Sequence, residues 1–180
     1  MRKIFFASAL AIVSFIGVNA QSGNNQVGVA FDLGIPTGDL GDAVKTGFGG
    51  QVRGLLGVGT AGQVSLTVGY ASFKEKEETG ADLKMTILPI LAGYRHNFNG
   101  IYVEPQVGYG SYGAKATYLG SEVSNSDGAF TWAAGVGYAK NGIDIGARYQ
   151  SGKPKDSDNW TLVGIHIGYN FTLGGASASK

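Results

Sequence analysis

The sequence predicts an all-β fold, an eight-stranded antiparallel up-and-down transmembrane β-barrel. The first observation behind this prediction is the stretch Trp160–Leu173, where every odd position from Val163 onward is a large apolar residue. Its even positions are mostly glycine or polar, and nearly uncharged. An apolar face opposite a small polar face is typical of a strand that turns its apolar side to lipid and its other side to a crowded barrel interior. The second observation is that seven earlier segments repeat the alternation, and the third is that their connections alternate between long and short.

The N-terminus has the pattern of a secretory signal peptide. Met1-Arg2-Lys3 is followed by the apolar run Ile4–Val18 and then by Asn19-Ala20-Gln21. A basic start, a short apolar run and a small residue before the junction predict cleavage after Ala20. We therefore expect residues 1–20 to direct Sec export and residues 21–180 to form one barrel domain. The chain has no Cys, which excludes disulfides, thiolate metal sites and lipoprotein processing.

Charge and glycine content narrow the class of protein further. Removal of the leader leaves 12 of the 14 basic residues against 13 acidic ones, so the mature chain is near neutral. Nothing in this balance suggests binding to nucleic acid. Glycine accounts for 31 of 180 residues without a collagen period. These glycines lie inside the strand patterns, where a packed lumen or a tight bend can use a missing side chain.

The first three mature strands show the alternation clearly. Strand 26–35 is apolar at its odd positions and carries Asp32 on the opposite face. Strand 47–58 places Arg53 on its inner face, and strand 63–73 alternates large apolar residues with serine, threonine and glycine. Because successive side chains of a strand point to opposite faces, both charged residues are expected in the lumen.

The fourth strand and two connections are less regular. Strand 85–98 is apolar on both parities at its start, so its facing rests on its second half, with Tyr94 assigned outward and Arg95 inward. The connection 36–42 is rich in Pro, Gly and Asp and is expected to be a loop that includes a short helical turn. The connection 74–84 is highly charged and is expected to be a solvated loop.

The remaining strands return to clean alternation. Strand 101–112 carries Glu104 on its inner face. Strand 143–150 carries Asp144 and Arg148 on its inner face. Two further strands, 130–139 and 160–173, complete the eight, and most of the segments are close to the length of about 9–11 residues that a tilted membrane strand needs.

The connections are expected to place short turns and both termini at one end. Gly59–Gly62, Asn97–Gly100 and Lys140–Gly142 read as tight turns, because Asn-Gly readily supplies the positive-φ residues of a primed turn. Lys115–Asp127 and Ser151–Asn159 are polar and are expected to be long loops at the other end. Aromatic residues near strand ends are expected to form interfacial girdles: Phe31, Phe73, Tyr94, Tyr149, Tyr169 and Phe171.

The mature chain resembles the small eight-stranded outer-membrane barrels of the OmpA/OmpX type. Its last strand, which ends on Phe171, resembles the C-terminal signal by which such barrels are recognised for assembly. Gly34-Ile35-Pro36-Thr37-Gly38-Asp39 and Leu88-Pro89-Ile90 resemble the outer membrane β-barrel proteins of Bacteroidetes-type bacteria. The resemblance implies short periplasmic turns, longer outer loops and a place in the outer membrane of a Gram-negative cell. The tail Gly174–Lys180 is too short for the periplasmic peptidoglycan-binding domain of full-length OmpA.

The inward charges are the candidate functional residues. Three acidic residues and three arginines sum to zero: Asp32, Arg53, Arg95, Glu104, Asp144 and Arg148. Charges in a narrow lumen need partners, and the planar arginine fork suits carboxylates. We expect an internal Arg/carboxylate network that fills the barrel, because an eight-stranded lumen is just wide enough for side chains. The alternative is a gate in a narrow ion path.

These patterns favour an integral outer-membrane protein with a structural or cell-surface interaction role. The alternative is a narrow porin-like channel for ions or small solutes, and a distant third is an outer-membrane enzyme that modifies lipid. A lipid deacylase of this architecture is expected to carry a His-x-Ser motif. Neither histidine fits this motif, since His96 is followed by Asn97-Phe98 and His166 by Ile167-Gly168. Gly57-x-Gly59-x-x-Gly62 lacks the helix that a dinucleotide site requires. We expect no enzyme activity, catalytic residue, metal or cofactor.

The expected partners follow from this location. The barrel-assembly machinery is expected to recognise the C-terminal strand, and the barrel is expected to be monomeric. Outer-membrane lipids and lipopolysaccharide are expected to surround the chain. Five loop lysines are candidate contacts for their phosphates: Lys74, Lys76, Lys84, Lys153 and Lys155.

Overall fold

The structure is a computed structural model that describes residues 24–76, 82–118, 121–155 and 157–173. The predicted signal peptide, residues 1–20, lies outside the described residues. So does the tail 174–180. Among the described residues, no helix has the length and apolar character needed to cross a membrane.

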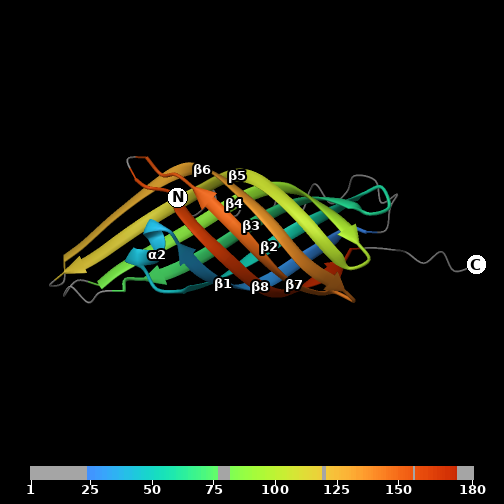
Figure 1. The fold of residues 1–180 in the computed structure, drawn as a ribbon, viewed down its shortest axis with the longest axis horizontal. Coiled ribbons are helices and arrows are strands. Elements are labelled where there is room, and N and C mark those ends of the chain that lie inside the picture. Colours follow the sequence, from blue (N-terminus) through green and yellow to red (C-terminus); the bar gives the residue numbers. More distant parts are fainter. Residues whose placement is uncertain (1–23, 77–81, 119–120, 156, 174–180) are drawn as a thin grey trace, which may run out of the picture.

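Eight strands form one closed antiparallel barrel (Figure 1). Each strand pairs with its neighbours in sequence, and β1 pairs with β8 to close the barrel. The strands are β1 (Gln26–Thr37), β2 (Gly47–Val58), β3 (Gly62–Lys74), β4 (Asp82–Phe98), β5 (Ile101–Tyr118), β6 (Ser121–Lys140), β7 (Ile143–Gly152) and β8 (Trp160–Thr172). The predicted eight-stranded up-and-down barrel is confirmed.

The two faces of the sheet follow the predicted alternation. Large apolar side chains such as Phe31 and Tyr109 point outward and are more than half exposed, at 52% and 58%. The facing of β4 is confirmed, since Tyr94 is outward and Arg95 is fully buried. An apolar exterior around a closed barrel is the arrangement expected of strands in lipid, because closure leaves no unpaired backbone edge in the membrane.

One end of the barrel, here called the turn end, carries the three tight turns at 59–61, 99–100 and 141–142. Both termini of the barrel lie there, since Gln26 pairs with Thr172. Asn141 and Gly142 both have positive φ, 54° and 85°, and Asn99 and Gly100 do as well. These dihedrals match a primed hairpin turn, so the Asn-Gly prediction is confirmed.

The opposite end, here called the loop end, carries the helix α2 (Asp39–Ala43) between β1 and β2. The helical turn predicted within 36–42 is therefore confirmed. Its N-terminal neighbour Gly38 has φ 62°, a conformation that only glycine adopts at little cost.

The predicted polar loop Lys115–Asp127 is wrong. β5 and β6 remain paired out to Tyr118 opposite Ser121 and rise beyond the rest of the barrel (Figure 1). β4 joins them through Asp82 opposite Thr117, so residues 82–86, 113–118 and 121–127 form a raised sheet of three strands, and the end of β3 pairs with residues 84–86 at its base. Polar composition suggested a loop, but a strand pair with water on both faces needs no apolar side, because the ladder satisfies its backbone.

Phe73 corrects the predicted aromatic girdle. Its side chain is only 1% exposed and points into the lumen, on the same parity as the inward residues of β3. Gly34 and Gly47 on neighbouring strands make room for it, since a Cβ on Gly34 would lie 3.0 Å from the ring. The lumen is therefore apolar towards the loop end, where the sequence predicted a polar interior.

Candidate functional site

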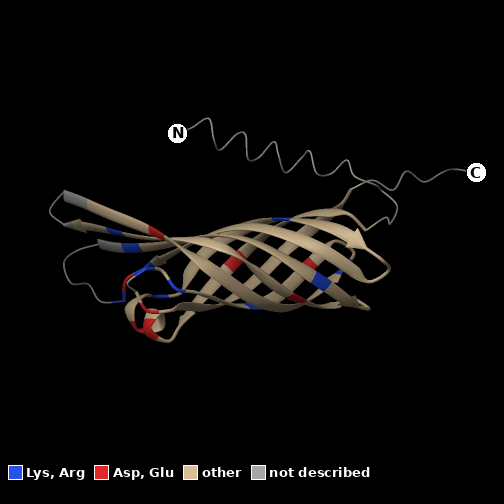
Figure 2. Ribbon diagram, turned by 90° about the horizontal axis from the view of Figure 1, so that it is seen from above, with Lys and Arg blue, Asp and Glu red and all other residues tan. Residues whose placement is uncertain are grey.

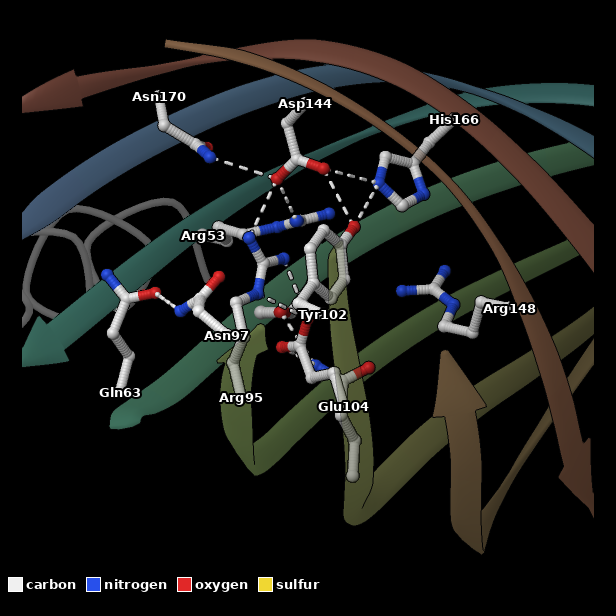
Figure 3. A network of polar contacts seen from close by, with 12 residues as sticks. Arg53, Gln63, Arg95, Asn97, Tyr102, Glu104, Asp144, Arg148, His166 and Asn170 are labelled. Carbon is white, nitrogen blue, oxygen red and sulfur yellow. Dashed lines mark hydrogen bonds and ion pairs between the residues drawn. The ribbon is translucent and has the colours of Figure 1, made fainter. Parts of the chain in front are cut away.

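Asp144 on β7 is the centre of the polar network in the lumen (Figure 3). Its Oδ2 accepts hydrogen bonds from Arg53 Nη1 at 2.8 Å, Arg95 Nη1 at 2.9 Å and Asn170 Nδ2 at 2.9 Å. Tyr102 donates to its Oδ1 at 2.7 Å. One carboxylate thus gathers side chains from β2, β4, β5 and β8.

Arg95 connects this centre to Glu104. Its Nη2 and Nε lie 2.7 Å and 3.0 Å from Glu104 Oε2. Its guanidinium also stacks over the Tyr102 ring, with 3.7 Å between Cζ and the ring centroid. Glu104 Oε1 accepts a further bond from Gln106 at 3.0 Å. An arginine with no exposed surface thus has two carboxylates and an aromatic face, which offsets the cost of burying its charge.

A second group of charges lies beside the first. Arg148 Nη1 donates to Gln51 Oε1 at 3.1 Å, and Gln51 Nε2 donates to Asp32 Oδ1 at 2.9 Å. Gln51 therefore bridges an arginine and a carboxylate that the sequence placed on the same inner face. Arg148 Nε is buried and has no hydrogen-bond partner among the described residues. The six charges predicted for the lumen thus divide into a group of four and a group of two.

His166 lies between the two groups and was not among the predicted site residues. Its Nε2 is 3.1 Å from Asp144 Oδ1 and 3.0 Å from the Tyr102 hydroxyl, and its strand partner on β1 is Asp32. Tyr102, His166 and Asn170 all carry the inward parity of their strands. That parity, applied to neutral side chains as well as charged ones, is the signal that would have found them.

Apolar side chains close the loop end of the lumen, in an arrangement that the sequence did not predict. Leu40 of α2 and Val44 after it are 4% and 1% exposed. They pack with side chains from five strands, and the whole cluster, here called the apolar plug, comprises Leu40, Val44, Phe73, Ile87, Tyr112, Ala129 and Leu162. The spacing of four residues between Leu40 and Val44 puts both on one side of a helical turn.

Hydrogen bonds hold α2 against the outer end of β3. Lys45 N donates to Lys74 O at 2.7 Å, and Lys76 N donates to Ala43 O at 3.1 Å. The Lys76 ammonium also donates to Gly41 O. The plug is therefore attached through both its side chains and its backbone.

Described residues line two hollows along the lumen. One of about 220 Å³ lies at the turn end and is lined by Gln26, Gln63, Asn97, Asn170 and, on its inner side, Arg95. The other, of about 20 Å³, lies between the network and the plug beside Arg148 and Leu162. The larger hollow has room for several waters and the smaller for about one.

The described residues show no group of three or more His, Asp or Glu that could hold a metal ion. His96 points outward near the turn end and lies 3.3 Å from the Tyr94 hydroxyl. The hydrogen bonds of His166 go to Asp144 and Tyr102. The polar contacts of the two histidines are therefore with tyrosine and carboxylate groups, and the His96 ring also packs against Phe98 with 4.5 Å between the ring centroids.

Solved structures similar to this chain are small outer-membrane barrels. Ail of Yersinia pestis, solved in complex with the heparin analogue sucrose octasulfate, matches at 18% identity and a TM-score of 0.67 over 84% of this chain and 100% of Ail. Neisserial surface protein A matches at 19% identity and 0.59, over 84% of this chain and 98% of that protein. The N-terminal barrel of Pseudomonas aeruginosa OprF matches at 16% identity and a TM-score of 0.57, over 83% of this chain and 100% of the OprF barrel. At sequence identities this low, the similarity to these structures shows the fold alone.

No curated protein sequence matches the chain. The family model described as outer membrane protein beta-barrel domain matches residues 8–173. This match confirms the predicted outer-membrane barrel of the OmpA/OmpX type and implies the outer membrane of a Gram-negative cell. The chain therefore belongs to the family of outer membrane protein β-barrel domains.

Proposed function

We propose that the protein is a closed outer-membrane barrel that presents the raised sheet for interactions at the cell surface. The observation that carries this proposal is the free edge of β6. β7 pairs with β6 only from Thr131 to Lys140. Over residues 121–130, therefore, none of the eight strands pairs with the edge of β6 that faces away from β5. A row of unpaired backbone groups is a template on which a partner can add an extended strand.

The lumen supports a surface role over a transport role. The network fills the middle of the barrel, and the apolar plug lies beyond it at the loop end. Of the six predicted charges, we propose that Arg53, Arg95, Glu104 and Asp144 are structural, because each is buried and hydrogen-bonded to another. Removing any one would take a charged partner from at least one other buried charge. We propose the same structural role for the Asp32–Arg148 group.

The test shortens the raised sheet without opening the barrel. Lys115 and Ser124 are opposite one another, so residues 116–123 can be replaced by an Asn-Gly turn. Bacteria that display this trimmed variant should lose adhesion to protein-coated surfaces, while a boiling-dependent gel shift remains. Equal adhesion by both forms, or none above empty-vector cells, would contradict the proposal.

A narrow channel is the second candidate, and the 220 Å³ hollow at the turn end favours it. That hollow would serve as a polar vestibule leading to Arg95, and the network would then act as a gate. Single-channel recording of refolded protein distinguishes the two, because a reproducible ohmic conductance would assign transport and a silent bilayer would support the closed barrel.

Several expectations accompany the proposal. The turn end faces the periplasm, the leader is cleaved after Ala20, and the assembly machinery recognises β8 through its outward row ending at Phe171. The barrel is monomeric and has no enzyme activity, and the relation to Bacteroidetes-type proteins stays a prediction. Mass spectrometry of lipid A from cells with and without the protein would reveal a lipid-modifying activity.

A further inference from the structure

The hollow at the turn end is lined mainly by uncharged polar side chains. Its volume is about 220 Å³, and six of its twelve described lining residues carry a side-chain amide: Asn24, Gln26, Gln63, Asn97, Asn141 and Asn170. None of the twelve is acidic. Figure 2 shows that the hairpin turns at this end are mostly uncharged, whereas Lys, Asp and Glu gather in the connections of the loop end. A lining of amides suits a ligand that both donates and accepts hydrogen bonds, because each amide group does both.

Hydrogen bonds to the protein hold these amides in place. Gln63 Nε2 donates to Asn24 O at 2.9 Å, and Asn97 Nδ2 donates to Gln63 Oε1 at 3.1 Å (Figure 3). Asn170 Nδ2 donates to Asp144 Oδ2 at 2.9 Å. Gln63 and Asn170 are only 2% and 4% exposed. An amide offers two N–H donors and two acceptor lone pairs, so these bonds orient the groups and use part of their capacity. Groups oriented in advance lose little freedom when a ligand binds.

The electrostatics of the hollow favour an uncharged ligand. Arg95 borders it on the inner side, where its guanidinium lies 2.7 Å from a Glu104 oxygen and 2.9 Å from an Asp144 oxygen. The arginine charge is therefore already balanced by carboxylates. A charged ligand would leave water beside this balanced network, at a cost that its polar contacts would have to offset. The other basic residue among the described lining is Lys140, which is exposed to solvent.

The size of the hollow limits the ligand further. At about 30 Å³ of liquid volume per water, the hollow holds about seven waters, which is roughly the space of one sugar ring with its hydroxyl groups. A hydroxyl donates one hydrogen bond and accepts two, so neighbouring hydroxyls can pair with the N–H and C=O groups of several amides. The network around Asp144 ends the hollow on its inner side, so a ligand enters and leaves at the turn end.

We infer that the turn-end hollow is a binding pocket for an uncharged, hydroxyl-rich molecule of the size of one sugar ring. The pocket lies at the opposite end of the barrel from the raised sheet and is independent of its surface role. It requires no passage through the lumen. The amides that form it come from distant parts of the chain, with Gln26 on β1, Gln63 on β3 and Asn170 on β8.

The test titrates the refolded, isotope-labelled barrel with glucose and follows the side-chain amide signals by NMR. The detergent has no sugar headgroup. The site variant is Ala139→Leu, which adds a larger side chain to the lining without removing an amide. The matched control is Ala134→Leu, on the lipid-facing side of the same strand. Gln26→Met removes one lining amide and keeps the length of the side chain. A boiling-dependent gel shift checks that each variant is folded.

We expect glucose to bind the wild type with a Kd of about 1–10 mM, as for a ligand with few heavy atoms. Ala139→Leu should weaken binding at least about fivefold, because it takes up space that the ligand needs. Gln26→Met should weaken it about threefold through a lost hydrogen bond. Ala134→Leu and Lys140→Gln should stay within about twofold of the wild type. Glucuronate, the same ring with a carboxylate, should bind more weakly than glucose.

Absence of a saturable shift with glucose would overturn the inference, as would equal binding by Ala139→Leu and the wild type or an equal loss in Ala134→Leu. Tighter binding of glucuronate that is lost in Lys140→Gln would instead assign the hollow to an anion, and tighter binding of N-acetylglycinamide would assign it to a peptide. The trimmed variant described above keeps the described lining of the hollow, so its glucose binding should equal that of the wild type whether or not its adhesion is lost.

Discussion

Two regions of the same lumen, the polar network around Asp144 and the apolar plug beneath α2, are built from opposite chemistry. The network joins five strands through one carboxylate and two arginines with no more than 4% exposure. The plug joins α2 to the strands through side chains such as Leu40 and Phe73. Charges in the network depend on each other, because the attraction between partners offsets the cost of removing each charge from water. Side chains of the plug depend on contact area and fit.

The polar network and the apolar plug should therefore fail in different ways. Removal of one network residue takes a partner from others that stay charged and buried, so the damage extends through the middle of the barrel. Removal of one plug residue leaves a small cavity at the loop end and unsettles α2 alone. The expected stability losses therefore differ in size and in location.

Asp144→Ala should have the largest effect. It removes the shared partner of Arg53, Arg95, Tyr102 and Asn170, and we expect it to cost about 3–5 kcal/mol of unfolding free energy. Urea unfolding of the refolded barrel in detergent, followed by the gel shift, measures the loss. Asp127→Ala, in the raised sheet, is the control and should change stability by less than about 1 kcal/mol. Equal losses in the two variants would remove Asp144 from the centre of the network.

Leu40→Ala should have an intermediate and local effect. The lost apolar contacts and the cavity should weaken the plug by about 2 kcal/mol. Limited proteolysis should therefore cut the 38–46 connection faster than in the wild type, with little change in the urea midpoint of the barrel. Ile35→Ala, on the lipid-facing side of β1, is the control. Unaltered cleavage of the connection would show that Leu40 does not hold it.

Tyr102→Phe should have the smallest effect of the three. The ring stays beneath Arg95, and only the hydroxyl bonds to Asp144 and His166 are lost. Asp144 keeps its bonds to Arg53, Arg95 and Asn170, so loss of the hydroxyl should cost about 1 kcal/mol, near the low end for a buried hydrogen bond to a charged group. Tyr138→Phe, on the outer face near the turn end, is the control and should be nearly neutral. A loss as large as that of Asp144→Ala would indicate that the hydroxyl, rather than the carboxylate, organises the network.

The sequence allowed the network to be anticipated in outline but not in its connections. Alternation assigns Arg95 and Asp144 to the lumen because side-chain direction has a period of two in a strand. It does not say that these residues meet, since that depends on the register of the three strand pairs between β4 and β7. Gln51 as a bridge and His166 as a neighbour of both groups follow only from the closed barrel.

The plug and the raised sheet were missed for different physical reasons. The plug comes from a connection rich in Pro, Gly and Asp, where composition indicates a loop and only the spacing of Leu40 and Val44 indicates a buried side. The raised sheet is polar because water surrounds it, so it lacks the apolar face by which the membrane strands were found. The alternation pattern assumes lipid on one face of a strand and a polar lumen on the other. Both errors arise in segments where one of these surroundings is replaced, by an apolar lumen at the plug and by water around the raised sheet.

The central claim is that the network and the plug each close the lumen. Its most direct test is single-channel recording of four proteins: the wild type, Glu104→Gln/Asp144→Asn, Leu40→Ser/Val44→Ser, and the variant with all four changes. The double variant of the network should also be less stable than the wild type, because its arginines lose their charged partners. If the network and the plug each close the lumen, the first three proteins should be silent and only the fourth should conduct. Ohmic conductance by the wild type, or silence of the fourth protein in its folded form, would contradict closure at two levels.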